Sequence, residues 1–174
     1  VGIQTYNNDV SLSEEQISLI VQWAKSGAPQ GDPALTPAQP KLPDASEWQL
    51  ASELGEPDFV VKSPPYTVTA NAQDQWWVRN TSFAGLIDEP RYVRATELKG
   101  SYPLGVKVLH HGHAQLRSND GNGNRASGPV GRQGVGKGGD RFPEGTGMLI
   151  YPEGTINWNL HYFPISEVVP NEQA

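Results

Sequence analysis

Proline and glycine make up almost a fifth of this chain, and their density limits its possible folds more than any other feature. The 174 residues include 15 prolines and 19 glycines. Proline disrupts the interior of a helix and glycine destabilises it, so helical bundles and doubly wound α/β folds do not carry this many of either residue. Antiparallel proteins with many turns tolerate both. The sequence therefore predicts an all-β fold.

Seven short segments with strand-forming residues are separated by turn signals. Turn sequences such as Asn119-Asp120-Gly121 are typical of antiparallel connections. This spacing predicts an antiparallel β-sandwich or jelly roll. The candidate strands are Phe59–Val61, Tyr66–Thr69, Gln75–Val78, Tyr92–Leu98, Val106–Leu116, Gly147–Tyr151 and Ile156–Phe163.

The N-terminal part differs in character and predicts a short helix over residues 11–26 followed by a linker. Ser11 and Glu14 form a capping-box pattern, and Gly27 provides the stop signal. Most of the prolines that follow fall before residue 66, which favours extended, semi-rigid chain. We therefore expect three parts, namely an N-terminal helical segment (1–27), a Pro-rich linker (28–55) and a β-sandwich domain (56–174).

Residues 119–140 are rich in glycine and contain almost no apolar residue that could anchor them in a core. Connections of this composition run over the surface and are mobile. We expect a long surface loop here.

The charge balance and the missing cysteines exclude several functions. Thirteen basic and 19 acidic side chains give a net charge of −6, which argues against nucleic acid or an anionic membrane as the main partner. The sequence contains no apolar run near the ~20 residues that a membrane-spanning helix needs. It also contains no cysteine, so disulfides, thiolate zinc sites and cysteine nucleophiles are excluded.

Histidine is scarce but clustered. Three of the four histidines, His110, His111 and His113, lie within four positions, and the fourth is His161. Imidazole is the commonest metal ligand in proteins and suits copper, zinc, iron and nickel. The cluster therefore predicts a metal site, provided that strand pairing brings His161 to the other three.

Two ligand sets are compatible with the spacing. The neighbours His110 and His111 point to opposite faces of a regular strand, so they converge on one ion only at a bulge, a strong twist or a strand end. Gly112 would tolerate such a distortion. On a regular strand the pair would instead be His111 and His113, which share one face. The spacing alone does not choose between these sets.

The surroundings of His161 suggest which residues could orient the histidine rings. Along residues 156–163 the large apolar side chains alternate with Asn157, Asn159 and His161, so His161 lies on a polar face. Gln115 shares a face with His111 by the same alternation. Asn157, Asn159 and Gln115 are therefore candidates for hydrogen bonds that fix the ring tautomers.

These residues resemble the first copper domain of the copper type II, ascorbate-dependent monooxygenases, a family that includes peptidylglycine α-hydroxylating monooxygenase and dopamine β-monooxygenase. The resemblance is carried by two strand-like runs, Val93–Leu98 and Val106–His111, the second of which ends in adjacent histidines. Asn159–Tyr162 is similar to a later strand of the family that ends in His-Tyr. Phe142–Gly147 and Pro152–Thr155 resemble the bacterial members, in many of which the copper region follows a c-type cytochrome domain.

The N-terminal part is similar to the end of such a cytochrome. Trp23–Pro29 and Gly31–Pro33 resemble its closing helix and exit, whereas the Cys-x-x-Cys-His motif for haem attachment is absent. No haem is therefore expected in this chain. The chain begins at Val1 rather than Met, and cleavage of a secretory signal is one route to such a start. We expect a periplasmic or extracellular location.

The resemblance implies a copper site. His110, His111 and His161 match the three ligands of the family's electron-transferring copper, which implies one copper ion per chain, and His113 has no family role. The family's second copper is held by two histidines and a methionine in a following domain, whereas here Met148 precedes His161. We therefore expect at most the electron-transferring half of a copper monooxygenase, with other chains or domains as partners. The alternative is a structural subunit of a larger, possibly haem-containing assembly, with a vestigial or absent metal site.

Overall fold

The computed structural model describes residues 9, 11–42, 44–134 and 137–174. The chain divides into two compact units, Val1–Leu42 and Pro43–Ala174, which are described here one at a time. The division falls inside the segment that was expected to be a linker. In the described part of the chain, no helix is both long and apolar enough to cross a membrane.

The first unit contains the expected helix, α1 (Glu14–Lys25), but with a different cap. The Oγ atom of Ser13 accepts a hydrogen bond from the Gln16 N–H at 3.2 Å, and the side chain of Gln16 accepts one from the Ser13 N–H at 2.8 Å. The capping box is therefore Ser13/Gln16, and the predicted pair Ser11/Glu14 was wrong. The capping residue thus lies two positions later than predicted, and the helix begins at Glu14, which lies in its first turn.

The end of α1 is as predicted. Gly27 has φ +90°, a backbone conformation that residues other than glycine rarely adopt, and the next residue donates its N–H to the Trp23 carbonyl at 3.0 Å. A short 3-10 helix, η1 (Pro33–Leu35), follows.

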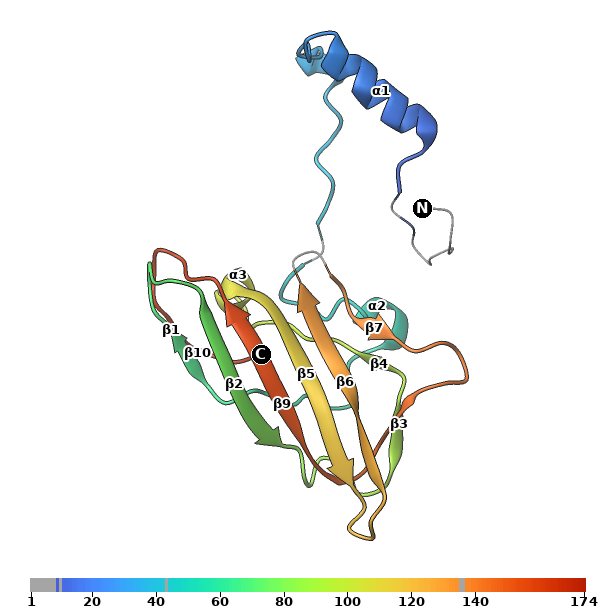
Figure 1. The fold of residues 1–174 in the computed structure, drawn as a ribbon, viewed down its shortest axis with the longest axis vertical. Helices are drawn as coiled ribbons and strands as arrows, with labels where there is room; N and C mark the ends of the chain where they lie inside the picture. The colour runs from blue at the N-terminus through green and yellow to red at the C-terminus, as the bar shows by residue number, and fades with distance from the viewer. Residues whose placement is uncertain (1–8, 10, 43, 135–136) are drawn as a thin grey trace. The chain divides into compact units, whose positions relative to one another are not determined.

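The second unit is built on a four-stranded antiparallel sheet. Its strands are β2 (Gln75–Ser82), β5 (Leu109–Asn119), β6 (Arg125–Gly134) and β9 (Glu153–Tyr162), in the order β2-β9-β5-β6 (Figure 1). The all-β prediction with a short N-terminal helix is confirmed.

Shorter elements accompany this sheet in the second unit. Three two-stranded antiparallel pairs and two helices of four residues complete the described architecture. They are β1 (Tyr66–Val68) with β10 (Val169–Glu172), β3 (Arg91–Val93) with β8 (Met148–Ile150), β4 (Ala95–Thr96) with β7 (Asp140–Arg141), α2 (Ala51–Leu54) and α3 (Gly105–Val108).

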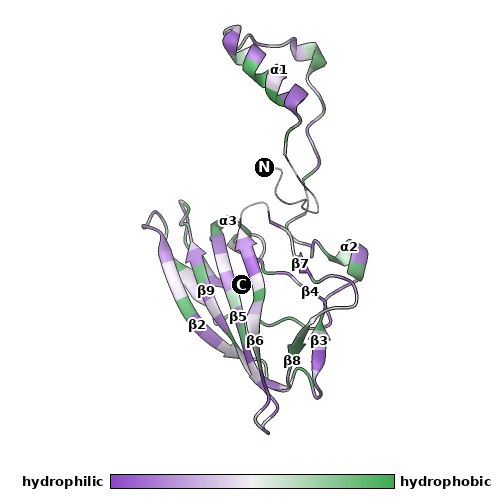
Figure 2. Ribbon diagram, turned by 45° about the vertical axis from the view of Figure 1, so that its right-hand side comes forward, coloured by the Kyte–Doolittle hydropathy of each residue, from purple (hydrophilic) through white to green (hydrophobic). Residues whose placement is uncertain are grey.

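The two faces of the four-stranded sheet differ. Apolar side chains such as Leu116, Trp158 and Leu160 alternate along the strands with polar ones and form the core on one face. Hydrophobic and hydrophilic positions alternate visibly along these strands (Figure 2). The other face, here called the outer face, carries the polar side chains. All four histidines belong to strands of this sheet, three on β5 and one on β9.

The expected surface loop over residues 119–140 was wrong, because β6 occupies its centre. Only a tight turn separates β6 from β5, with Asp120 accepting hydrogen bonds from the backbone N–H groups of Asn122 and Asn124. Backbone pairing needs no apolar side chain, so composition did not reveal the strand. Close packing favours glycine at position 131, since a Cβ there would lie 3.1 Å from Leu98 Cβ. Residues 135 and 136 lie outside the described residues.

Two other predicted strands were also displaced. The segment Phe59–Val61 forms no strand, although Phe59 and Val61 pack against the core. The predicted strand Val106–Leu116 begins only at Leu109, because α3 occupies the residues before it. As a result, the adjacent histidines lie at the very start of β5.

Candidate metal centre

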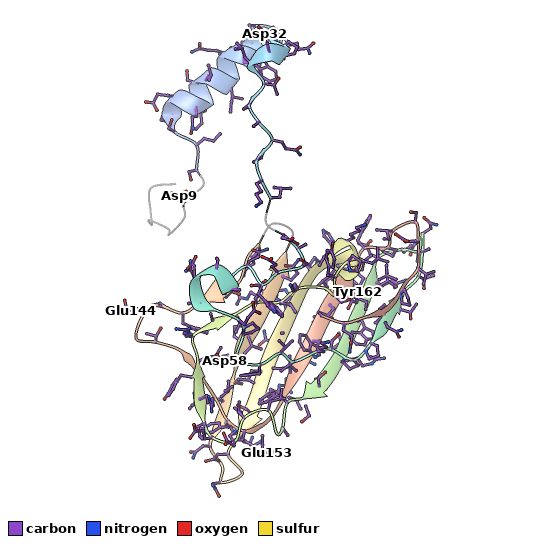
Figure 3. The ribbon with its side chains drawn as sticks, turned by 180° about the vertical axis from the view of Figure 1, so that it is seen from behind. Asp9, Asp32, Asp58, Glu144, Glu153 and Tyr162 are labelled. Atoms are coloured by element: carbon purple, nitrogen blue, oxygen red, sulfur yellow. The ribbon has the colours of Figure 1, made fainter. Side chains whose placement is uncertain are left out.

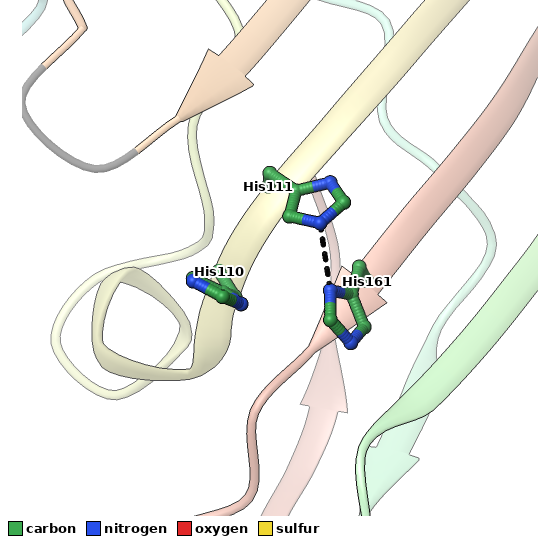
Figure 4. A group of neighbouring side chains, drawn as sticks. All are labelled: His110, His111 and His161. Atoms are coloured by element: carbon green, nitrogen blue, oxygen red, sulfur yellow. Dashed lines mark hydrogen bonds between the residues drawn. The ribbon is translucent and has the colours of Figure 1, made fainter.

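The structure brings three of the four histidines together. His110 and His111 are the second and third residues of β5, which follows α3 directly, and His161 lies one residue before the end of β9 (Figure 4). One ligand nitrogen from each ring can be chosen so that all three lie within 4.8 Å of one another. These histidines are close enough to hold one metal ion.

A β-bulge makes this convergence possible. In the β5–β9 register Leu109 pairs with Tyr162 and His111 pairs with His161, so two steps along β5 match one step along β9. His110 is the extra residue of the bulge. An unpaired residue leaves the strict alternation of side chains, and consecutive histidines can then approach the same point. The structure thus selects the bulged arrangement over the regular strand.

Gly112 is not the extra residue of the bulge, and His113 lies outside the three-histidine group. A Cβ on Gly112 would lie 2.9 Å from Leu160 Cδ2, so packing against the core favours glycine here, next to the bulge rather than in it. His113 is exposed and pairs in register with Asn159 on one side and Arg132 on the other. It is not part of the three-histidine group.

The distances within the group fit coordination of one ion. The His161 Nδ1 and His111 Nε2 atoms are 2.8 Å apart, and their ring centroids are 4.5 Å apart. The His110 centroid lies 5.2 Å from each of the other two. Two nitrogens bound at a right angle to one ion, with bonds of about 2.0 Å, lie roughly 2.8 Å apart. The pair of His111 and His161 already has this separation.

Burial increases from one ligand to the next. His110 is exposed, His111 is partly buried and His161 is only 6% exposed. Burial lowers the pKa of His111, and the nearby His161 and His110 rings lower it further, while Asp74 opposes them. Metals bind the neutral imidazole, so this shift favours the ligand form of His111.

Asp74 is a site residue that the sequence did not reveal. Its Oδ2 lies 3.0 Å from His161 Nε2. With Nε2–H donating to this carboxylate, Nδ1 is the nitrogen that faces His111 and is free to bind a metal. A carboxylate that holds the second nitrogen of a ligand histidine is a common feature of metal sites. Only the strand register reveals that Asp74 is near His161, because Asp74 lies two residues before Trp76, the residue that pairs with His161.

Two exposed aromatic side chains pack against the histidine rings. The Trp76 ring stacks on His161 with centroids 4.3 Å apart and planes at 5°, and its edge contacts His111. Phe163 packs edge-on against His110 with centroids 6.2 Å apart. Both aromatic side chains remain more than half exposed.

The three residues expected to orient the rings have other surroundings. Asn157 donates from Nδ2 to Asn80 Oδ1 at 2.8 Å, further along the sheet. The Oδ1 atom of Asn159 is buried without a hydrogen-bond partner in the described structure, and Asn159 lies two register pairs from the His111–His161 pair. Gln115 pairs in register with Asn157. Asp74 supplies the hydrogen bond to His161 that was expected from this set.

The chain was also compared with protein-family models, with curated proteins and with solved structures, and none of them matches it.

Proposed function

We propose that the β unit is a copper-binding redox domain in which His110, His111 and His161 hold one copper ion. The observation that carries this proposal is the convergence of three imidazole nitrogens within 4.8 Å at a bulge in β5. Asp74 would fix the tautomer of His161 through its hydrogen bond of 3.0 Å.

The donor set supports copper. It consists of three neutral nitrogen donors with no carboxylate among them. Imidazole binds both oxidation states of copper, and divalent copper binds nitrogen sites more tightly than the other divalent metals of its row. A bound copper ion would supply one-electron exchange between Cu(I) and Cu(II). The resemblance to the first copper domain of the ascorbate-dependent monooxygenases also favours this metal.

We further propose that the domain transfers electrons and does not complete an oxygenation alone. Among the described residues, one group of three metal-ligating side chains was found, and it includes three of the four histidines of the chain. A second copper centre, as in the monooxygenase family, would therefore belong to another domain or chain. A periplasmic or extracellular location is part of this proposal.

Metal content and electron paramagnetic resonance test the proposal directly. The full chain is purified, loaded with Cu(II) or Zn(II) and assayed for bound metal. We expect one copper per chain and hyperfine coupling to nitrogen. His111→Ala should lose the ion, whereas His113→Ala, which removes an exposed histidine two residues away on the same strand, should keep it.

The same experiment distinguishes this proposal from the alternative, in which the chain is a structural subunit. The observation that favours this alternative is that Asp74, His161 and His111 already form a chain of hydrogen bonds without an ion. Absence of bound copper under copper-replete conditions would leave a β scaffold. Stoichiometric zinc with no affinity for copper would retain the site but overturn the redox role.

A further inference from the structure

The histidines lie outside a large cavity of the β unit. That cavity, of about 880 Å³, is lined from the core face of the sheet by residues such as Leu116, Ile156 and Trp158. None of the three histidines lines it. Small molecules are usually bound in cavities that enclose most of their surface. The exposed position of His110 is better suited to a macromolecular partner that reaches the ion from outside.

An exposed apolar rim lies directly against the ligand rings. Trp76 is 59% exposed and Phe163 is 56% exposed, and each contacts a histidine of the group. Val78, two residues after Trp76 on the same outer face, is 48% exposed. Exposed aromatic side chains, tryptophan above all, contribute most to protein–protein interfaces. We call these three residues the apolar rim.

Positive charge lies on the same outer face as the rim, on the strands β5 and β6. The pairing register places Arg117, Arg125 and Arg132 on this face, with Glu153 as the acidic residue among its strand positions. The chain as a whole has a net charge of −6, so this face differs in sign from the molecule. Arg132 pairs with His113, next to the site. Arg117 is six residues from His111 on β5, about 20 Å at roughly 3.4 Å per residue.

We infer that the outer face, centred on Trp76, docks an acidic electron-transfer protein. The inference rests on the proposed function and names the partner of the same site. The arginines attract the acidic partner, and the apolar rim brings its redox group close to the histidines. One electron leaves the reduced group of the partner and converts Cu(II) to Cu(I), so the exchange is balanced. Complexes of this kind bury less than about 1,200 Å² and dissociate readily.

Nuclear magnetic resonance titration of the metal-free, ¹⁵N-labelled full chain tests the docking without depending on copper uptake. The probes are cytochrome b5, which is acidic, and cytochrome c, which is basic. We expect cytochrome b5 to shift the backbone amides of Trp76, Val78 and Arg132 at low salt. These shifts should disappear at 0.5 M salt, where the Debye length is only a few ångström. Cytochrome c should leave the chemical shifts of the same amides unchanged.

Matched variants separate docking from general effects of charge and hydrophobicity. Arg132→Glu and Trp76→Ala should each weaken cytochrome b5 binding by about fivefold or more. Lys62→Glu makes the same charge change at a residue that lines the cavity on the core side of the sheet. Tyr92→Ala removes an aromatic side chain that is 72% exposed on β3. Both controls should bind like the unmodified chain.

The outcomes have distinct meanings. Shifts confined to another surface, equal binding of both cytochromes, or no effect of Trp76→Ala and Arg132→Glu would overturn the docking. Copper uptake by Trp76→Ala, followed separately by electron paramagnetic resonance, should persist because this ring is not a ligand. Loss of the docking with retained copper would refute only the inference about the partner, whereas docking without copper uptake would refute only the proposed function.

Discussion

The hydrogen bond between Asp74 and His161 offers a quantitative test of the metal centre. Asp74 Oδ2 lies 3.0 Å from His161 Nε2, and the Asp74 side chain is 47% exposed. A hydrogen bond to a charged group contributes about 1.5–3 kcal/mol, and a neutral one about 0.5–1.5 kcal/mol. Because Asp74 is half exposed, we take the lower end of each range, a difference of about 1 kcal/mol between aspartate and asparagine.

This difference converts to a change in metal affinity. Asp74→Asn should weaken copper binding about fivefold, since 1.4 kcal/mol corresponds to tenfold. Asp74→Ala, which leaves the ring without its support, should weaken it by about 10- to 100-fold. Competition with a coloured copper chelator at pH 7 measures both constants. Asp88→Asn is the matched control, because that carboxylate is almost fully exposed in another part of the fold.

A second measurement checks the tautomer without any metal. In the metal-free chain, ¹⁵N chemical shifts should show the proton of His161 on Nε2, and Asp74→Ala should mix the two tautomers. The reasoning is refuted if Asp74→Ala binds copper within twofold of the unmodified chain while His161→Ala does not bind it. In that case the carboxylate would be a neighbour of the site with no influence on the ligand.

Three further predictions concern stability. Burial raises the pKa of Glu172, so the folded chain keeps a proton that the unfolded chain releases above about pH 4.3. The contribution of this group to the free energy of unfolding is fully present below that pH and is lost as the pH rises through the raised pKa. Glu172→Gln should flatten the decline in urea titrations between pH 4 and 8. Gly105→Ala should lower the free energy of unfolding by about 1–3 kcal/mol in the same assay, because the added Cβ would overlap the Glu172 carboxyl group. Gly134→Ala is the control, since its Cβ would meet no atom within 4 Å and should leave the free energy of unfolding nearly unchanged. Leu160→Ala removes a fully buried side chain and should cost about 2–5 kcal/mol.

The end of the sheet that carries the metal centre also contains the most buried polar groups of the described chain. Ser101 donates hydrogen bonds from both its N–H and its Oγ to the carboxyl group of Glu172. Tyr162, next to His161, is fully buried, and its hydroxyl has no hydrogen-bond partner. Figure 3 shows Tyr162 at the end of the sheet where α3 lies. Burial raises the pKa of Tyr162, with the carboxyl group of Glu172 adding to the effect. We expect mutations there to affect folding, so His111 and Asp74 are the better positions for testing the metal centre.

Sequence patterns predicted the features that depend on composition and alternation. The density of proline and glycine predicted an all-β unit, and the alternation around His161 placed that residue on the polar face. Strand β6 was not predictable in the same way. Its residues between Arg125 and Gly134 include glycine and proline, and they pair with β5 through backbone groups that leave no pattern in the side chains.

The convergence of the histidines required information that local spacing does not contain. Whether His110 and His111 point to one ion depends on which residue of β9 stands opposite each, and this register is set by packing of Leu160 and its neighbours over the whole sheet. Asp74 illustrates the same limit. It precedes β2 by one residue and is 87 residues from His161, so only the β2–β9 pairing brings it to the ring.

The register also explains how a polar histidine becomes buried on the side of a sheet that faces away from the core. His161 points to the outer face, yet it is only 6% exposed. The β2–β9 pairing places Trp76 beside it, and the indole ring lies parallel to the imidazole at 4.3 Å. The tryptophan remains 59% exposed, so it shields its neighbour without belonging to the core. A shielded ligand beside an exposed aromatic ring combines a protected metal ligand with a contact surface for a partner. The same side chain therefore links the proposed metal centre to the proposed docking face, and the two proposals can still fail separately because only one of them needs the ion.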